Sequence, residues 1–217
     1  MRLYDKYQAK KTSDVIGHDD AKRRLVAILQ REDFDRGAFL FCGPSGIGKT
    51  SLALSLARGF AGIDKESEFW DLEVIDGDTC TVDMVHDIER RLHLSAHSQS
   101  GWKAVVINEC HAMTSRAVQA WLTLLERLPG KRLIFFTTTK DGDSLFGEYA
   151  GPFASRCFCF SLKATVALTS ALAERARAIA QAEGLDGRPL EEYVSLVSRH
   201  KCNFRAVLNA IESGEML

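Results

Sequence analysis

The sequence predicts an α/β protein in which a parallel sheet flanked by helices is followed by a small all-helical domain. Short apolar runs alternate with helical patterns as far as about residue 161, and only helical patterns follow. A glycine-rich loop joins the first apolar run to a helical pattern, which is the usual setting of a phosphate-binding loop. We therefore expect an α/β domain at residues 1–161 and a helical lid domain at residues 162–217.

Five short apolar runs are expected to form the strands. The run at residues 103–107 is apolar from Ala104 onward, which is typical of a strand covered by helices on both faces. The expected strands are residues 38–42, 72–75, 103–107, 132–136 and 157–160.

Apolar side chains at helical spacing predict the helices. From Val118, for example, apolar residues recur at i, i+3, i+4 and i+7, and Pro129 and Gly130 end the pattern. The expected helices are residues 20–31, 51–60, 81–92 and 115–127 in the first domain and residues 166–183, 190–199 and 204–212 in the second.

A complete G-x-x-x-x-G-K-T motif occupies residues 43–50. Its glycines let successive backbone N–H groups point at phosphate oxygens, Lys49 can reach the terminal phosphates, and Thr50 can hold magnesium. The order strand, loop, helix favours nucleoside triphosphate binding over a turn that binds nothing. The residues expected at the nucleotide are Gly43, Pro44, Ser45, Gly46, Ile47, Gly48, Lys49, Thr50 and Ser51.

Asn108 and Glu109 follow the apolar run at residues 103–107, where a triphosphate-cleaving site needs carboxylates. Glu109 can act as the base that polarises water. Asn108 stands where an aspartate is usual, and we expect it beside the metal with Thr50. The neutral amide could cost about 10 to 100-fold in metal affinity or turnover. The alternative is that both residues merely end a strand.

Composition excludes some functions. Lysine and arginine number 28 against 29 acidic residues, so any DNA contact must be a local patch. There is no signal-peptide pattern and no apolar run of about 20 residues, so we expect a cytoplasmic protein without membrane contact. The six cysteines form no C-x-x-C pair, so we expect reduced thiols and no zinc site.

The chain resembles the AAA+ ATPases, and among them the bacterial clamp-loader ATPase subunit, the gamma/tau subunit of DNA polymerase III. Residues 7–18 are similar to that family's Y-R-P-x-x-F-x-D-V-V-G-Q opening, and residues 74–77 and 121–126 match two further segments. The resemblance implies that the nucleotide is ATP, with Mg²⁺, and that Val15 and Ile16 pack on the adenine.

Three further matches imply catalytic roles. The strand ending at residues 135–139 implies that Thr139 is the sensor 1 residue, with Thr138 as an equally simple alternative. Residues 155–163 are similar to the S-R-C-x-x-F-x-L-K signature, which makes Arg156 the candidate arginine finger for a neighbouring subunit. Residues 203–209 resemble the lid motif that carries sensor 2, which implies that Arg205 reaches the γ-phosphate. Both arginines could instead be ordinary surface residues.

The departures from the family matter as well. The insert with four zinc-binding cysteines is missing, and residues 140–154 are longer than in the family, which could displace Arg156. The chain stops after the lid, without the collar domain that holds the family's pentamer together. We therefore expect assembly through the ATPase surfaces, through partner subunits, or not at all.

The resemblance implies an ATPase subunit of a loader that places a sliding clamp on primer-template DNA, with other loader subunits or copies of itself as partners. One alternative is a subunit that binds ATP with little turnover because of Asn108. Another is a different AAA+ DNA motor, for branch migration or initiation. Arg90, Arg91 and Arg116 are candidates for DNA contact, although solvated helix charge is the simpler interpretation.

Overall fold

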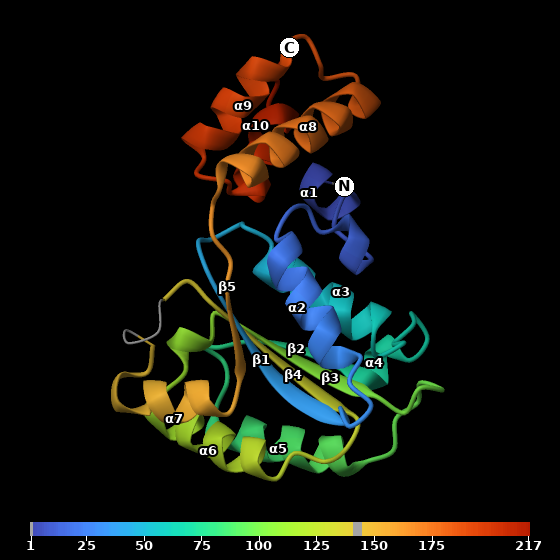
Figure 1. Cartoon of the computed structure of the whole chain (residues 1–217), viewed down its shortest axis with the longest axis vertical. Helices are drawn as coiled ribbons and strands as arrows, with labels where there is room; N and C mark the ends of the chain where they lie inside the picture. The colour runs from blue at the N-terminus through green and yellow to red at the C-terminus, as the bar shows by residue number, and fades with distance from the viewer. Residues whose placement is uncertain (1, 141–144) are drawn as a thin grey trace.

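The computed structural model describes residues 2–140 and 145–217. Its sheet has five parallel strands in the order β2-β3-β4-β1-β5 (Figure 1). This confirms the predicted α/β class. The strands are β1 (Arg36–Cys42), β2 (Leu72–Asp76), β3 (Lys103–Asn108), β4 (Arg132–Thr138) and β5 (Phe158–Ser161).

Helices cover both faces of the sheet. Figure 1 shows α2, α3 and α4 on one face and α5, α6 and α7 on the other, with α8, α9 and α10 grouped beyond one end of the sheet. The helices are α1 (Leu3–Lys6), α2 (Asp19–Leu29), α3 (Lys49–Gly59), α4 (Glu68–Asp71), α5 (Val82–His93), α6 (Ser115–Glu126), α7 (Ala150–Ser155), α8 (Val166–Glu183), α9 (Leu190–Arg199) and α10 (Phe204–Glu212).

Strand alternation divides the core into two apolar clusters. Phe39 and Phe41 of β1 point to the face covered by α3, where Leu52 packs with them. Leu40 points to the opposite face and packs in the cluster that contains Trp121 of α6. Because both faces are buried there, residues 38–42 of β1 are all apolar, as the uninterrupted run predicts.

The lid helices share the first of these clusters. Leu168, Tyr193 and Val207, one from each lid helix, belong to the same group of buried residues as Phe41 of the sheet. The domain boundary between residues 161 and 162 stays a prediction, because one apolar cluster contains residues of both the sheet and the lid.

Short elements escape the sequence patterns. A helix of four residues, such as α1 or α4, is too short to show a 3.6-residue period. The expected long helices are present. The helix expected at residues 20–31 spans Asp19–Leu29, and the helix expected at residues 51–60 spans Lys49–Gly59. Of residues 140–154, residues 141–144 lie outside the described ones, and α7 occupies the end of this segment.

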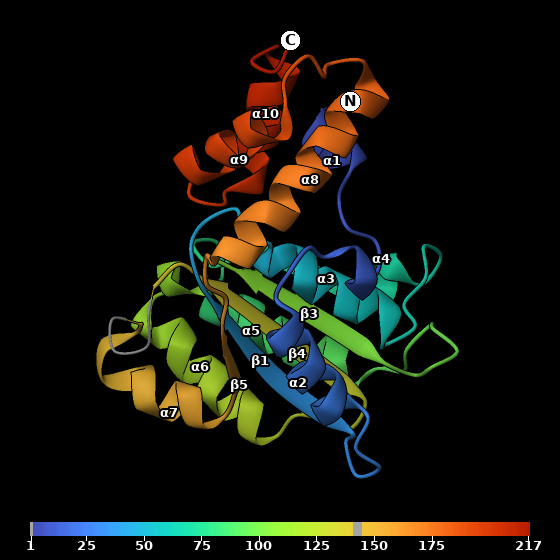
Figure 2. The ribbon, with the colours of Figure 1, turned by 45° about the horizontal axis from the view of Figure 1, so that its top comes forward.

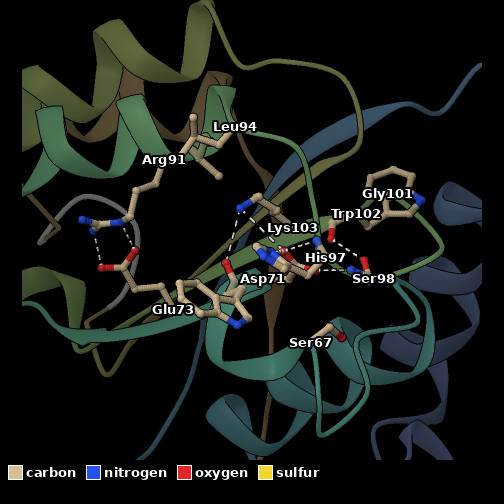
Figure 3. Close-up of polar contacts among 12 residues, drawn as sticks. Ser67, Asp71, Glu73, Arg91, Leu94, His97, Ser98, Gly101, Trp102 and Lys103 are labelled. Atoms are coloured by element: carbon tan, nitrogen blue, oxygen red, sulfur yellow. Dashed lines mark hydrogen bonds and ion pairs between the residues drawn. The ribbon is translucent and has the colours of Figure 1, made fainter.

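A buried ion pair joins the last residue of α4 to the first residue of β3. The Asp71 carboxylate is fully buried, lies 3.6 Å from Lys103 Nζ, and accepts hydrogen bonds from the backbone N–H groups of His97 and Ser98 (Figure 3). Burial by itself would raise the pKa of Asp71, but these backbone hydrogen bonds and the lysine outweigh it, so the pKa is lowered. The exposed pair Arg91 and Glu73 lies nearby in the same view.

Asp71→Asn should lower the free energy of unfolding by about 3 kcal/mol at pH 7, because Lys103 would be left buried without a counter-charge. Since the folded-state pKa of Asp71 lies below its unfolded value of about 3.9, this stabilisation is present above that pH and is lost as pH falls through the folded pKa. Urea unfolding at a series of pH values, from pH 7 into the acidic range, measures this change in the free energy of unfolding.

The control variant is Glu73→Gln, which breaks the exposed pair with Arg91 and should cost less than about 1 kcal/mol. A loss of stability in Asp71→Asn that is no larger than in Glu73→Gln at pH 7 would contradict the assignment of the buried pair.

Candidate functional site

The phosphate-binding loop joins β1 to α3, and two of its glycines are required by close neighbours. Gly43 and Gly46 have φ angles of +152° and +73°, in the region that favours glycine. A Cβ atom on Gly43 would come within 2.3 Å of the Leu162 carbonyl oxygen, and one on Gly46 within 1.9 Å of Asn203 Oδ1. The loop therefore lies directly against the connection to the lid and against the start of α10.

Lys49 begins α3 and lies inside the loop. Only 4% of the residue is exposed, and its Nζ donates hydrogen bonds to the carbonyl oxygens of Gly43 at 2.8 Å and Pro44 at 2.9 Å. Burial lowers the pKa of Lys49, and the Glu109 carboxylate opposes this shift. The loop carbonyls thus hold the amine in place at the N-terminus of a helix, where anions bind.

Thr50 and Asn108 meet beside the loop. The Thr50 hydroxyl donates to Asn108 Oδ1 at 2.9 Å, so the end of β3 and the first turn of α3 are in contact. Together with Glu109 they offer a hydroxyl, an amide oxygen and a carboxylate, which are the oxygen ligands that Mg²⁺ prefers. The donor set fits Mg²⁺, with one negative charge fewer than an aspartate at position 108 would supply.

Glu109 has an unusual backbone conformation. Its φ angle is +46°, which is uncommon outside glycine, and its N–H donates to Thr137 Oγ1 at 3.2 Å. Its Oε2 accepts a hydrogen bond from Thr139 Oγ1 at 3.3 Å and lies 3.4 Å from His111 Nδ1. Such backbone strain is characteristic of functional sites.

Thr139, rather than Thr138, contacts the candidate base. The Thr138 hydroxyl is buried and shares a hydrogen bond with His111 Nδ1 at 3.1 Å. Thr139 is exposed, and its contact with Glu109 is compatible with the expected sensor 1 role, which stays a prediction.

A pocket with a cavity volume of about 140 Å³, open to solvent on one side, lies between the loop and the lid. Residues expected from the sequence that line it are Val15, Ile16, Ser45, Gly46, Ile47, Gly48, Lys49, Thr50, Ser51, Glu109 and Arg205. Gly43 and Pro44 do not line it and instead hold Lys49.

The pocket also contains residues to which the sequence analysis assigned no role. They come from the N-terminal segment and from the lid, two parts of the chain whose approach depends on the folded structure. These residues are Tyr4, Tyr7, Gln8, Ala9, Asp14, Leu172, Arg175, Phe204 and Leu208.

Arg205 reaches the pocket from α10. The N–H of Phe204 donates to the Gly46 carbonyl oxygen at 3.1 Å, and the Asn203 side chain caps the helix by accepting from Ala206 N–H at 3.2 Å. The first turn of the lid helix therefore rests on the phosphate-binding loop, which places Arg205 beside it.

Arg156 lies elsewhere. It follows α7, forms an ion pair with Glu126 of α6, and donates from Nη1 to the Pro152 carbonyl oxygen at 2.8 Å. It does not line the pocket of its own chain. Its expected role as an arginine finger for a neighbouring subunit stays a prediction.

The candidate DNA-contacting arginines are partly engaged. Arg90 pairs with Asp87, and Arg91 pairs with Glu73 at 2.6 Å. These pairs favour solvated helix charge, and DNA contact by Arg90, Arg91 or Arg116 stays a prediction. Among the described residues, no helix has the length and apolar character needed to span a bilayer.

The family model of the DNA polymerase III delta subunit matches residues 17–165. The chain belongs to this family. The expected membership of the AAA+ clamp-loader subunits is thereby confirmed, with the delta subunit as the matching model where the motifs had suggested gamma/tau. The matched region contains the loop, Asn108, Glu109, Thr139 and Arg156.

Relatives of this delta-subunit family member include both archaeal and bacterial replication proteins. The replication factor C small subunit of Halobacterium salinarum is 26% identical over 96% of this chain and 61% of that protein. The DNA polymerase III subunit gamma/tau of Mycoplasma pneumoniae is 25% identical over 74% of this chain and 25% of that protein. The chain thus spans about three fifths or less of these relatives.

Solved structures of the Thermotoga maritima RuvB Holliday junction branch migration motor share the fold. One covers 95% of this chain and 64% of its own length, with a TM-score of 0.69 and 17% sequence identity. At that identity the likeness establishes the AAA+ fold alone.

Proposed function

We propose that this chain binds ATP with Mg²⁺ between its sheet and its lid, and hydrolyses it as a subunit of an assembly that loads a sliding clamp onto primer-template DNA. The observation that carries the proposal is the convergence of Lys49, Glu109 and Arg205 on one pocket in a member of the clamp-loader subunit family. The likeness to RuvB supports the fold only, and it gives no support for branch migration.

Each group has a role that follows from its position. The loop N–H groups and Lys49 bind the phosphates, and Thr50 and Asn108 would hold Mg²⁺, which when bound neutralises charge on the phosphate oxygens. Glu109 accepts a hydrogen bond from Thr139 and can take up the proton of an attacking water. Arg205 supplies positive charge from the lid, and Arg156 supplies it to a neighbouring subunit.

The contact between Thr50 and Asn108 favours a second candidate function. The oxygen that meets the Thr50 hydroxyl is a neutral amide, so the metal would be held less strongly than by an aspartate. In this case the chain binds ATP as a structural ligand and turns it over slowly.

Asn108→Asp should raise turnover and tighten Mg²⁺, by up to about 10 to 100-fold if position 108 acts on the metal. The added carboxylate places a negative charge where Thr50 now meets a neutral oxygen. Steady-state turnover at a series of Mg²⁺ concentrations measures both effects. Unchanged or lower rates, with the thermal stability unchanged, would count against a metal role for residue 108.

Two measurements separate the candidate functions. We expect calorimetry to detect ATP binding, and a phosphate-release assay to detect Mg²⁺-dependent hydrolysis that rises when primed DNA, a clamp and partner subunits are added. Tight ATP binding with no turnover under any of these conditions would contradict the proposal that the chain hydrolyses ATP. It would support the second candidate function, in which ATP is a structural ligand. No ATP binding would contradict both.

A further inference from the structure

The N-terminal turn α1 is attached to the lid. Leu3 is buried in the apolar cluster that the lid helices share, and Lys6 Nζ lies 2.6 Å from Glu183 Oε1 at the end of α8. The Tyr7 hydroxyl donates to the same carboxylate. Figures 1 and 2 both show α1 beside the lid helices. The turn therefore belongs structurally to the lid, although it is separated from it by the whole sheet domain in sequence.

Tyr4 of this turn holds the Arg205 side chain in two ways. Arg205 Nη2 donates to the Tyr4 hydroxyl at 2.9 Å, and the guanidinium carbon lies 4.3 Å from the centre of the Tyr4 ring. Among the described residues, Arg205 forms no ion pair with a carboxylate. Its positive charge is thus held by a ring and a hydroxyl that leave most of its N–H donors available for an anion.

Both residues line the pocket, and the backbone beneath Arg205 is fixed. Phe204 N–H is bonded to the loop at Gly46, so the remaining freedom of Arg205 is in its long side chain. An arginine side chain loses much rotamer entropy when it is immobilised, and a partner that confines it beforehand reduces this loss on binding. The Tyr4 ring confines it before any nucleotide arrives.

We propose that Tyr4 is a positioning residue for Arg205, so that the N-terminal turn contributes to the discrimination of nucleoside triphosphate from diphosphate. This inference rests on the proposed function and assigns it a residue outside the loop and lid motifs. Tyr4 acts through the arginine and does not need to touch the nucleotide. A tyrosine that only packed α1 against the lid would affect both nucleotides alike.

The test compares binding of a non-hydrolysable ATP analogue and of ADP by calorimetry. Tyr4→Phe keeps the ring and loses the hydroxyl, and should weaken the analogue about 3-fold; Tyr4→Leu loses both contacts and should weaken it about 10-fold. ADP affinity should change less than about 2-fold in either variant, because Arg205 is expected to meet the terminal phosphate. Asp5→Asn, at an exposed position of the same turn that does not line the pocket, is the control and should leave the ratio unchanged.

The variant Arg205→Ala completes the comparison. In that background Tyr4→Leu should have no further effect on the ratio, since the two residues act as one unit. Equal weakening of both nucleotides by Tyr4→Leu, or an undiminished effect without Arg205, would overturn the inference. The inference would also be overturned if Arg205→Ala still bound ATP with an unchanged ratio of analogue affinity to ADP affinity. That outcome would not contradict the proposed function. A wild-type protein that binds neither nucleotide overturns both.

Discussion

Arg156→Ala should lower the turnover of the assembled complex by about 10³-fold while leaving ATP affinity in the isolated chain unchanged. Arg156 lies outside the pocket of its own chain, held by Glu126 and the Pro152 carbonyl, and its Nε is buried without a partner among the described residues. We therefore expect this guanidinium to stabilise phosphoryl charge across an interface with a neighbouring subunit. A phosphate-release assay with partner subunits measures the turnover, and calorimetry on the isolated chain measures the ATP affinity.

Arg127→Ala is the matched control, because Arg127 is an exposed arginine next to Glu126 and outside the pocket. It should leave turnover unchanged. Mixing Arg156→Ala with Lys49→Ala should restore part of the activity in assemblies that contain several copies. The Arg156→Ala subunit supplies an intact phosphate-binding loop, and the Lys49→Ala subunit supplies the arginine. Absence of any recovery, despite demonstrated mixing, would speak for a site completed within one chain.

Lys49→Met should weaken ATP by about 10 to 100-fold, because one charge-assisted contact to the phosphates is worth about 1.5 to 3 kcal/mol. The methionine keeps most of the apolar stem that α3 buries, so the fold should persist. The amine is already at the loop, bonded to Gly43 and Pro44, and needs no long movement to reach a phosphate. Calorimetric titration with ATP measures the loss.

Lys65→Met removes an exposed lysine that does not line the pocket and should leave ATP affinity unchanged. If Lys49→Met bound ATP as tightly as the wild type, the loop would not be the triphosphate site. Both variants should show the same thermal unfolding midpoint in the absence of nucleotide, within a few degrees, if the loss is one of contact alone.

The sequence motifs predicted those parts of the site in which neighbouring residues of the chain determine both the chemical groups and the backbone geometry. The loop is determined locally by its glycines, and Glu109 is determined by its place at the end of a buried strand. Parallel strands bring such ends together at one edge of a sheet, which is why residues 43–50 and 109 could be predicted to meet. The AAA+ clamp-loader family was predicted from a resemblance carried by further segments, among them residues 7–18, 155–163 and 203–209.

Residues whose position depends on distant packing could not be predicted in this way. Tyr4 lies in a turn too short to show periodicity, and it reaches the pocket only because Leu3 and Lys6 attach the turn to a lid far along the chain. Arg175 lines the pocket from α8, but a single arginine on an amphipathic helix carries no signal of its own. The ion pair of Arg156 with Glu126 is likewise a tertiary contact.

The hydrogen bond from Phe204 to Gly46 has a consequence for the kinetics of nucleotide exchange. The first turn of α10 and the loop border the same pocket, so we expect a bound nucleotide to leave more readily when this contact opens. The residence time of the product would then be set by how often one backbone hydrogen bond and its apolar surroundings open.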